Sequence, residues 1–154
     1  MESLKKYSIF KLTNLPKGHK TIGCRWVFDI KSDGQKKAQL VAQGFSQVEG
    51  IDYNELFSPV VQFESMKIIF ALNQWYMTGV DVCMAYLYGK LDEEIYMHQP
   101  EGFIAIGQEN KVRCLQCTLY GLKHAGLAWW KELSQSMKVL SFKHLNSDAR
   151  IFVC

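Results

Sequence analysis

The chain has 154 residues, a length typical of one domain, and 48% of them are hydrophobic, which excludes an intrinsically disordered chain. Its net charge of +3 permits an anionic partner without indicating one. Five cysteines, an odd number, and a first segment without the apolar core of a signal peptide predict an intracellular protein, cytoplasmic or nuclear, that is not secreted. No apolar run reaches membrane-spanning length, so no membrane contact is predicted.

The first half of the chain predicts a β-hairpin followed by a helix. Residues 1–14 are expected to form a leading segment before the domain. Alternating apolar residues in "TIGCRWVFDIK" and "KKAQLVAQGF" predict two half-buried strands, joined by a tight turn at Asp33-Gly34. The apolar spacing then becomes that of a helix from Glu64 to about Trp75.

The second half predicts strands around one longer helix. "GVDVCMAYLYG", residues 79–89, alternates as a strand, a second strand ends at Pro100, and a third lies within residues 110–123. Apolar residues spaced by three or four predict an amphipathic helix from Leu127 to Leu140. A last apolar strand has no partner after it, so the domain is expected to be incomplete. The mixture of elements predicts an α+β or α/β fold.

Asp81 is a candidate functional residue, because it interrupts the apolar run of residues 79–89. Burying an unpaired carboxylate is costly, so Asp81 is either an edge residue facing water or a lysine, or a metal ligand. Two-metal phosphoryl transfer needs several carboxylates around the cations. The six aspartates of the chain are well separated in sequence, so the residues alone leave both interpretations open.

Two further motifs carry weak signals. The "CLQC" motif, Cys114 to Cys117, has the spacing of a zinc site, but no second pair of cysteines or histidines completes it, so no structural zinc is predicted. Several lysines are available to meet phosphate groups, and their alternative role is an ordinary solvated surface; they are Lys31, Lys36, Lys37 and Lys123.

Four blocks, in order, resemble the reverse transcriptase of copia-type retrotransposons. They are "IGCRWVFDIK", "LVAQGFSQVEGIDYNELFSPVV", "VDVCMAYLYGKLDEEIYMHQPEGF" and "LYGLKHAGLAWW", and the resemblance extends from about Leu15 to Val153. It implies the RNA-directed DNA polymerase domain of a pol polyprotein, with an α+β right-hand polymerase fold. The fingers would comprise about residues 15–75 and 89–123, and the first part of the palm about residues 76–88 and 124–154.

The same resemblance implies a substrate set and a cofactor. The family extends a DNA primer on an RNA template, consumes deoxynucleoside triphosphates and uses two divalent cations, usually Mg²⁺. Such chemistry depends on positioning and on charge neutralisation more than on covalent help from the protein. Template and primer would be held mainly through backbone charge and shape.

The resemblance also assigns roles to individual residues. Asp81 matches the first catalytic aspartate, and the backbone carbonyl of Val82 would be a further ligand of the metal. Tyr86 matches the aromatic residue that packs under the incoming sugar and excludes a 2′-hydroxyl. The remaining matches are nucleotide-binding positions: Lys31 and Lys37 in the fingers hairpin, and Tyr120, Gly121 and Lys123 in the block that packs on the nascent base pair.

Departures from the family pattern lower the expected activity. The aromatic-x-Asp-Asp block that carries the other catalytic carboxylates is missing, so the chain is expected to be truncated and inactive by itself. Compared with the family, the chain looks several residues short between Gly34 and Ala38, in the hairpin, and between Leu72 and Trp75, just before the palm. The residues that differ from the family pattern include Gln39, Gln43, His124, Gly126 and Leu127. The alternatives are a non-catalytic nucleic-acid-binding module and a non-functional gene relic.

Overall fold

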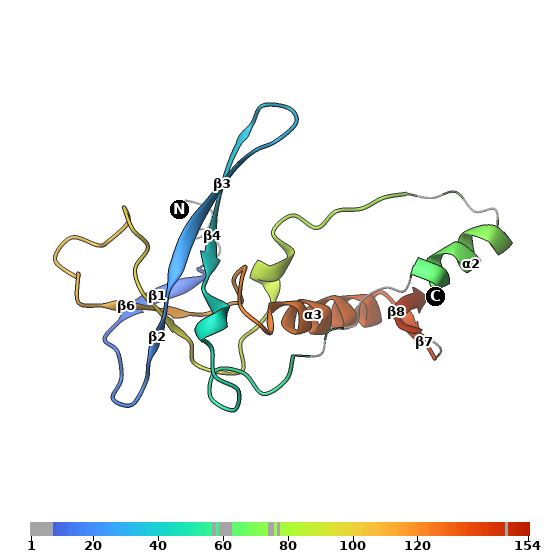
Figure 1. The fold of residues 1–154 in the computed structure, drawn as a ribbon. Coiled ribbons are helices and arrows are strands. Elements are labelled where there is room, and N and C mark those ends of the chain that lie inside the picture. The colour runs from blue at the N-terminus through green and yellow to red at the C-terminus, as the bar shows by residue number, and fades with distance from the viewer. Residues whose placement is uncertain (1–7, 57, 59–62, 74–75, 77, 147) are drawn as a thin grey trace.

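The computed structural model describes residues 8–56, 58, 63–73, 76, 78–146 and 148–154; residues 1–7 of the predicted leading segment, and Trp75, lie outside these ranges. The structure is α+β (Figure 1). No helix in the described ranges is long and apolar enough to cross a membrane. The helices are η1 (Gly44–Ser46), α2 (Phe63–Asn73), η2 (Ala85–Tyr88) and α3 (Ala125–Val139), where η denotes a 3-10 helix. The strands are β1 (Phe10–Thr13), β2 (Thr21–Ile22), β3 (Cys24–Ile30), β4 (Lys36–Ala42), β5 (Tyr96–Met97), β6 (Val112–Leu115), β7 (Lys143–Leu145) and β8 (Asp148–Val153).

The core of the protein lies at a four-stranded sheet of order β1-β6-β5-β2. β6 pairs antiparallel with β1 and with β5, and β5 pairs parallel with β2. Ile9 and Met97 are fully buried here, and they share one apolar cluster with Leu119 and Ala42. Because Ile9 precedes β1, part of the predicted leading segment belongs to the core. The sequence did not predict β1, which is a strand because β6 supplies its hydrogen-bonding partner.

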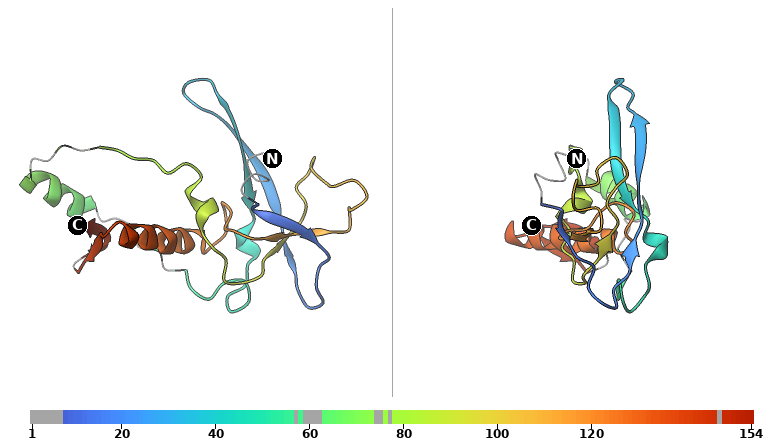
Figure 2. Two further views of the ribbon diagram at one scale, coloured as in Figure 1. Left: turned by 180° about the vertical axis from the view of Figure 1, so that it is seen from behind. Right: turned by 90° about the vertical axis from the view of Figure 1, so that its left-hand side faces the viewer.

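The predicted hairpin is confirmed as β3 and β4, paired antiparallel from Cys24 opposite Ala42 to Ile30 opposite Lys36. Gly34 adopts a φ of +80° in the connecting turn, a conformation that glycine reaches without strain. The two strands form an arm that extends from the rest of the molecule (Figures 1 and 2). The predicted half-burial therefore holds only near the base, and Ile30 close to the turn is 69% exposed.

Both predicted helices are present. α3 is amphipathic, buries Leu127 and Ala128, and packs against η2. α2 ends at Asn73, close to the predicted end. It lies at the far end of α3, beside the β7–β8 hairpin (Figure 1). The hydroxyl of Ser65 on α2 hydrogen-bonds to the Asp148 carboxylate of β8, which joins these two elements.

Two strand predictions are wrong or incomplete. Residues 79–89 are not a strand: residues 78–82 are irregular, a turn follows, and η2 occupies Ala85–Tyr88. No strand in the described part of the chain pairs with this run, so its backbone groups close a 3-10 turn. The final strand does have a partner, because β8 pairs antiparallel with β7, which precedes it.

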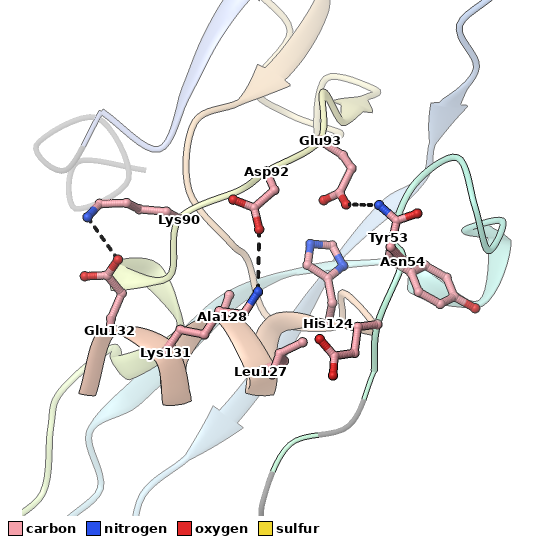
Figure 3. Close-up of a pocket in the computed structure, with 11 residues that line it drawn as sticks. Tyr53, Asn54, Lys90, Asp92, Glu93, His124, Leu127, Ala128, Lys131 and Glu132 are labelled. Carbon is pink, nitrogen blue, oxygen red and sulfur yellow. Dashed lines mark hydrogen bonds and ion pairs between the residues drawn. The ribbon is translucent and has the colours of Figure 1, made fainter. Parts of the chain in front are cut away.

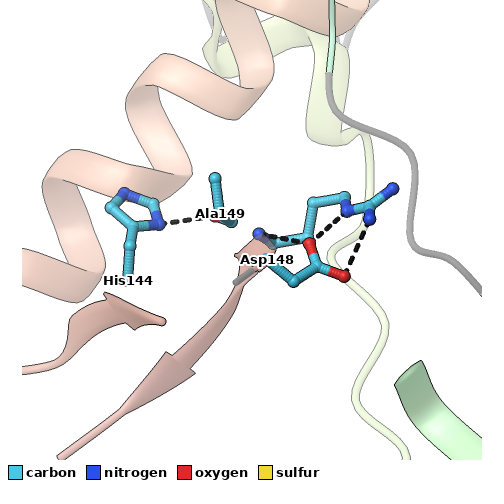
Figure 4. A network of polar contacts seen from close by, with 4 residues as sticks. His144, Asp148 and Ala149 are labelled. Carbon is cyan, nitrogen blue, oxygen red and sulfur yellow. Dashed lines mark hydrogen bonds and ion pairs between the residues drawn. The ribbon is translucent and has the colours of Figure 1, made fainter. Parts of the chain in front are cut away.

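A network of polar contacts holds the β7–β8 hairpin together (Figure 4). The guanidinium of Arg150 grips the Asp148 carboxylate through Nε and, at 2.7 Å, through Nη2. The ring nitrogen Nδ1 of His144 lies 2.5 Å from the carbonyl oxygen of Ala149. The side-chain hydrogen bonds from Arg150, aided by the Arg150 backbone N–H and the Ser65 hydroxyl, lower the pKa of Asp148 to about 2 from its ordinary 3.8.

This network predicts a specific acid sensitivity. Because the folded pKa of Asp148 is depressed, its charged form stabilises the fold above pH 3.8, and that contribution is lost as the pH falls toward about 2. We expect Asp148→Asn to be less stable than the wild type at pH 6 and to lose less further stability between pH 4 and pH 2. Urea denaturation followed by circular dichroism at each pH measures this. Asp29→Asn, on the exposed hairpin, is the control, and equal pH slopes in both variants and the wild type would contradict the prediction.

Candidate functional site

Asp81 lies on an exposed loop that leads into η2. Residues 78–82 have no regular structure, and Asp81 and Val82 are both exposed to solvent. Met84 adopts a left-handed conformation, with φ 57° and ψ 35°, at the start of η2. The backbone N–H of Leu87 then donates to the Met84 carbonyl at 2.8 Å. The carboxylate of Asp81 is therefore free to meet a ligand from solvent, on a loop whose last turn is fixed by η2.

Tyr86 and Tyr120 bring two distant segments together. Their rings meet edge to face, with centroids 5.2 Å apart and planes at 78°. The Tyr86 carbonyl accepts hydrogen bonds from the Thr118 hydroxyl and from the Gly89 N–H. Burial raises the pKa of Tyr120, and the nearby Tyr86 and the charge of Asp81 raise it further. Asp81 therefore lies close enough to Tyr120 for its charge to be felt.

The turn that carries Tyr120 and Gly121 anchors the base of the hairpin. The Ala42 N–H donates to the Tyr120 carbonyl at 2.7 Å. Gly121 has a φ of +88°, and a Cβ atom built on it would lie 2.2 Å from the Ala42 carbonyl oxygen. A Cβ on Gly44, just after the hairpin, would lie 2.1 Å from the Gly121 carbonyl oxygen. The backbone at Gly121 thus contacts the backbone at the end of the hairpin so closely that Gly44 and Gly121 leave no room for a Cβ atom.

Two of the predicted lysines, Lys31 and Lys37, do not lie with Tyr86, Tyr120 and Gly121. Lys31 lies at the turn of the hairpin, where its ammonium donates to the Gln35 side chain at 2.8 Å. Lys37 is exposed on β4, opposite Asp29 in the strand register. Both therefore lie on the projecting arm of Figures 1 and 2.

Lys123 makes contacts of another kind. Its ammonium donates to the Gln47 carbonyl at 3.1 Å and to the Tyr53 hydroxyl at 3.3 Å, and lies 5.1 Å from the centre of the Tyr53 ring. Its backbone N–H also donates to the Gln47 side chain at 2.8 Å. The structure thus brings Asp81, Tyr86, Tyr120 and Gly121 together, and it directs Lys123 to the loop that follows the hairpin.

Comparison with known proteins identifies the family. The family profile described as reverse transcriptase (RNA-dependent DNA polymerase) matches residues 7–154. The chain belongs to this reverse transcriptase family. It is 42% identical to the retrovirus-related Pol polyprotein from transposon TNT 1-94 of Nicotiana tabacum, over 160 aligned positions that cover 99% of the chain and 12% of the polyprotein. The Pol polyprotein from transposon RE1 of Arabidopsis thaliana is 42% identical over 147 positions, covering 90% of the chain and 10% of that protein.

These relatives are copia-type Pol polyproteins, as the sequence resemblance indicates. The chain spans only about a tenth of their length. The tobacco alignment has 160 positions, six more than the chain has residues, so that relative carries at least six residues in this span that the chain lacks. The prediction that losses fall in the fingers hairpin and before the palm is compatible with this difference. No solved structure matches the chain.

Among the described residues, the candidate site around Asp81 contains too few oxygen ligands for a metal pair. Asp81 and the Val82 carbonyl are oxygen donors of the kind that Mg²⁺ takes. Across the described ranges, no three His, Cys, Asp or Glu side chains form a group that could hold a metal ion. One carboxylate and one carbonyl do not replace the set that a two-metal site needs. The residues that the structure describes therefore do not by themselves fit the expected cofactor.

The two cysteines of the "CLQC" motif lie in different surroundings. Cys114 is buried on β6. Cys117 follows the strand, and its backbone forms an isolated antiparallel β-bridge with Lys90. Burial is the main cause that raises the pKa of both thiols. Burial therefore disfavours the thiolate, which is the form that binds a metal ion.

A polar hollow at the start of α3 was missed by sequence reasoning. It has a volume of about 300 Å³ and lies between the loop of Tyr53, the loop of Glu93 and the first turns of α3 (Figure 3). His124, buried at 6% exposure, lines it. The one sequence signal was the departure of "KHAGLAW" from the family block. The hollow itself depends on three segments meeting, which no local pattern reveals.

Proposed function

We propose that this chain forms the nucleotide-facing part of a reverse transcriptase that extends a DNA primer on an RNA template from deoxynucleoside triphosphates. The supporting observation is the convergence of three segments, distant in sequence, at Tyr86, Tyr120 and the hairpin base. In this proposal the fold is that of a right-hand polymerase. Residues of about 15–75 and 89–123 belong to the fingers, and those of about 76–88 and 124–154 to the palm.

The tyrosine pair suits contact with the incoming nucleotide. The ring of Tyr86 packs edge to face against the Tyr120 ring, and a hydrogen bond to the Tyr86 carbonyl holds the backbone that carries it. A fixed ring under the sugar would exclude a 2′-hydroxyl by volume and so select deoxynucleotides. Burial raises the pKa of Tyr120 further above its ordinary value of 10, so the phenol is protonated at neutral pH and adds no negative charge near a triphosphate. Gly121 allows close approach of the backbone to the nascent base pair.

Charged residues are assigned separate roles in this proposal. Asp81 and the Val82 carbonyl are the two oxygen donors that this chain would contribute to a divalent cation. The remaining carboxylates would have to come from outside the described residues. Lys31 and Lys37, exposed on the hairpin arm, would meet phosphate groups, and Lys123 would support the nearby turn through Gln47 and Tyr53.

A segment exchange tests the proposed function. Residues 15–153 of this chain replace the matching segment in a family member shown to extend primers, and a shorter exchange of residues 78–123 is made in parallel. We expect at least one exchange to retain RNA-templated extension with deoxynucleotides. If both exchanged proteins fold and bind primer–template like the parent, and neither extends the primer, the proposal is overturned.

The chain by itself should not polymerise. Primer extension with the purified 154-residue protein, Mg²⁺, RNA template and DNA primer is expected to give no product, because Asp81 supplies one carboxylate where several are needed. Template-dependent product that disappears in Asp81→Asn would show that this expectation is wrong.

Nucleic-acid binding without catalysis is the second candidate function, and the exposed cations of the hairpin arm favour it. Arg25, Lys31, Lys36 and Lys37 are all exposed there. If Lys31 and Lys37 contact phosphates, each should contribute about 0.7–0.9 to the slope of log K against log salt. Filter binding of Lys31→Ala/Lys37→Ala across a salt series measures this. Lys143→Ala, on β7, is the control and should leave the slope unchanged; an unchanged slope in the double variant would exclude the arm as the binding surface.

A further inference from the structure

The hollow at the start of α3 adjoins the proposed nucleotide site, because Tyr53, which lines it, accepts a hydrogen bond from the Lys123 ammonium at 3.3 Å. Figure 3 shows the ring of His124 standing between Asp92 and Glu93 on one loop and Tyr53 on another. The Tyr53 and His124 rings are nearly parallel, at 17°, with centroids 6.4 Å apart. Leu127 and Ala128 of α3 add an apolar wall. Its volume of about 300 Å³ would take a small side chain or a small organic ion.

His124 points to a missing ligand. The residue is 6% exposed, and neither Nδ1 nor Nε2 has a hydrogen-bond partner among the residues that the structure describes. Burial lowers the pKa of His124, while the charges of Glu93, Asp92 and Asp52 raise it and that of Lys131 lowers it. The neutral ring then has one donor and one acceptor. Leaving both unsatisfied in a buried site is costly, so a group that enters the hollow and donates a hydrogen bond would relieve that cost.

The charge of the lining indicates the sign of that ligand. The residues that line the hollow include four carboxylates and two ammonium groups, which are those of Glu55, Asp92, Glu93, Glu132, Lys90 and Lys131. Asp92 pairs with Lys131 at 3.6 Å, and Glu132 pairs with Lys90 at 3.0 Å. Glu93 accepts from the neutral amide of Asn54, at 2.8 Å. Within the described part of the chain, neither Glu93 nor Glu55 makes an ion pair. Two carboxylates thus remain without a cation, so the hollow favours a positively charged ligand.

We propose that this hollow binds a guanidinium group, the group of an arginine side chain. A guanidinium presents several N–H donors in one plane, which can meet carboxylates on two loops and the acceptor nitrogen of His124 together. A guanidinium also stacks on aromatic faces, and Tyr53 and His124 both line the hollow. A metal ion is disfavoured, because no three acidic, histidine or cysteine side chains in the described ranges form a cluster that could hold one. An ammonium ion has fewer donors and is more strongly hydrated.

The binding test uses methylguanidinium as the probe and the full 154-residue chain. Two-dimensional NMR spectra of the ¹⁵N-labelled protein are recorded during titration at constant ionic strength. We expect saturable shifts of the His124, Asp92 and Glu93 amides, with a dissociation constant on the order of 1 mM. Methylammonium, titrated in the same way, should bind at least about fivefold more weakly. Equal binding of the two ions, or no saturable shift at these amides, would overturn the proposal.

Variants locate the site. Glu93→Gln should weaken methylguanidinium binding about fivefold, because one charged contact is removed. Glu101→Gln, an exposed glutamate outside the hollow, is the matched control and should bind like the wild type. Leu127→Arg places a guanidinium inside the hollow and should abolish binding of the added ion. If Leu127→Arg does not fold, Glu93→Gln decides, and unchanged binding in that variant overturns the proposal.

The source of the guanidinium is tested separately. Agmatine represents a free small molecule, and a glycine–serine peptide with a single arginine represents a polypeptide partner. Tighter binding of the peptide would identify an arginine side chain as the ligand, and tighter binding of agmatine would identify a small molecule. Both results support the proposed chemistry, whereas failure of both to compete with methylguanidinium would contradict it.

Discussion

Replacing Gly121 by alanine is expected to lower the free energy of unfolding by about 3 kcal/mol. The new Cβ would lie 2.2 Å from the Ala42 carbonyl oxygen and 2.6 Å from Val41 Cγ1, so backbone must move. The φ of +88° adds strain for any residue other than glycine. The hydrogen bond from the Ala42 N–H to the Tyr120 carbonyl would be lost as the two segments separate.

Gly34→Ala separates the steric contact of the new Cβ atom from the backbone strain of a positive φ. Gly34 has a similar φ of +80°, but a Cβ on it would meet no atom within 4 Å. We expect a loss of only about 1 kcal/mol for this variant, from backbone strain alone. Urea denaturation followed by tryptophan fluorescence compares the two. Equal losses would show that the contact between Gly121 and the hairpin is unimportant, and the lack of any cooperative transition in the wild type would favour the gene-relic interpretation.

Asp81→Asn is expected to reduce primer extension by at least about 10²-fold in the active segment-exchange protein. Asparagine keeps the size of the side chain but removes the negative charge that a Mg²⁺ ligand needs. Asp81 is exposed and is not part of the buried core, so the fold should be unaffected. Single-turnover extension at saturating deoxynucleotide gives the rate.

Asp33→Asn is the matched control for this prediction. Asp33 lies in the hairpin turn, where its carboxylate accepts from the Gln35 N–H, and asparagine before Gly34 preserves the turn. We expect extension to stay within about twofold of the unmodified exchange protein. A similar loss in both variants would show that negative charge in general, and not the position of Asp81, limits the reaction.

Sequence patterns predicted the elements whose apolar spacing or turn residues are visible within the element itself. The hairpin followed from strict alternation and from Asp33-Gly34, and α3 followed from its apolar spacing. The run of residues 79–89 also alternates, yet it forms a loop and a 3-10 turn, because a strand requires a hydrogen-bonding neighbour and none is described there. β1 shows the opposite case, since its pairing with β6 supplies what its short sequence does not indicate.

The candidate site was predicted as residues but not as an arrangement. Family blocks indicated Asp81, Tyr86 and Gly121; ring contact joins Tyr86 to Tyr120, next to Gly121, and the charge of Asp81 acts on Tyr120. The contact between Gly121 and Ala42 joins positions far apart in sequence, and an isolated glycine in a turn does not reveal it. The unpaired nitrogens of His124 were equally hidden, because satisfaction of a buried polar group depends on neighbours from other segments.

The glycine contact at the hairpin base acts as a pivot. Each strand of the arm has seven residues, and at a rise of about 3.3 Å per residue the tip lies roughly 23 Å from this pivot. By the same geometry, a rotation of about 10° at the base would carry the tip through about 4 Å. A substitution near Gly44 or Gly121 that changed the angle of the arm would therefore displace Lys31 and Lys37, near the tip, much more than the residues at the base.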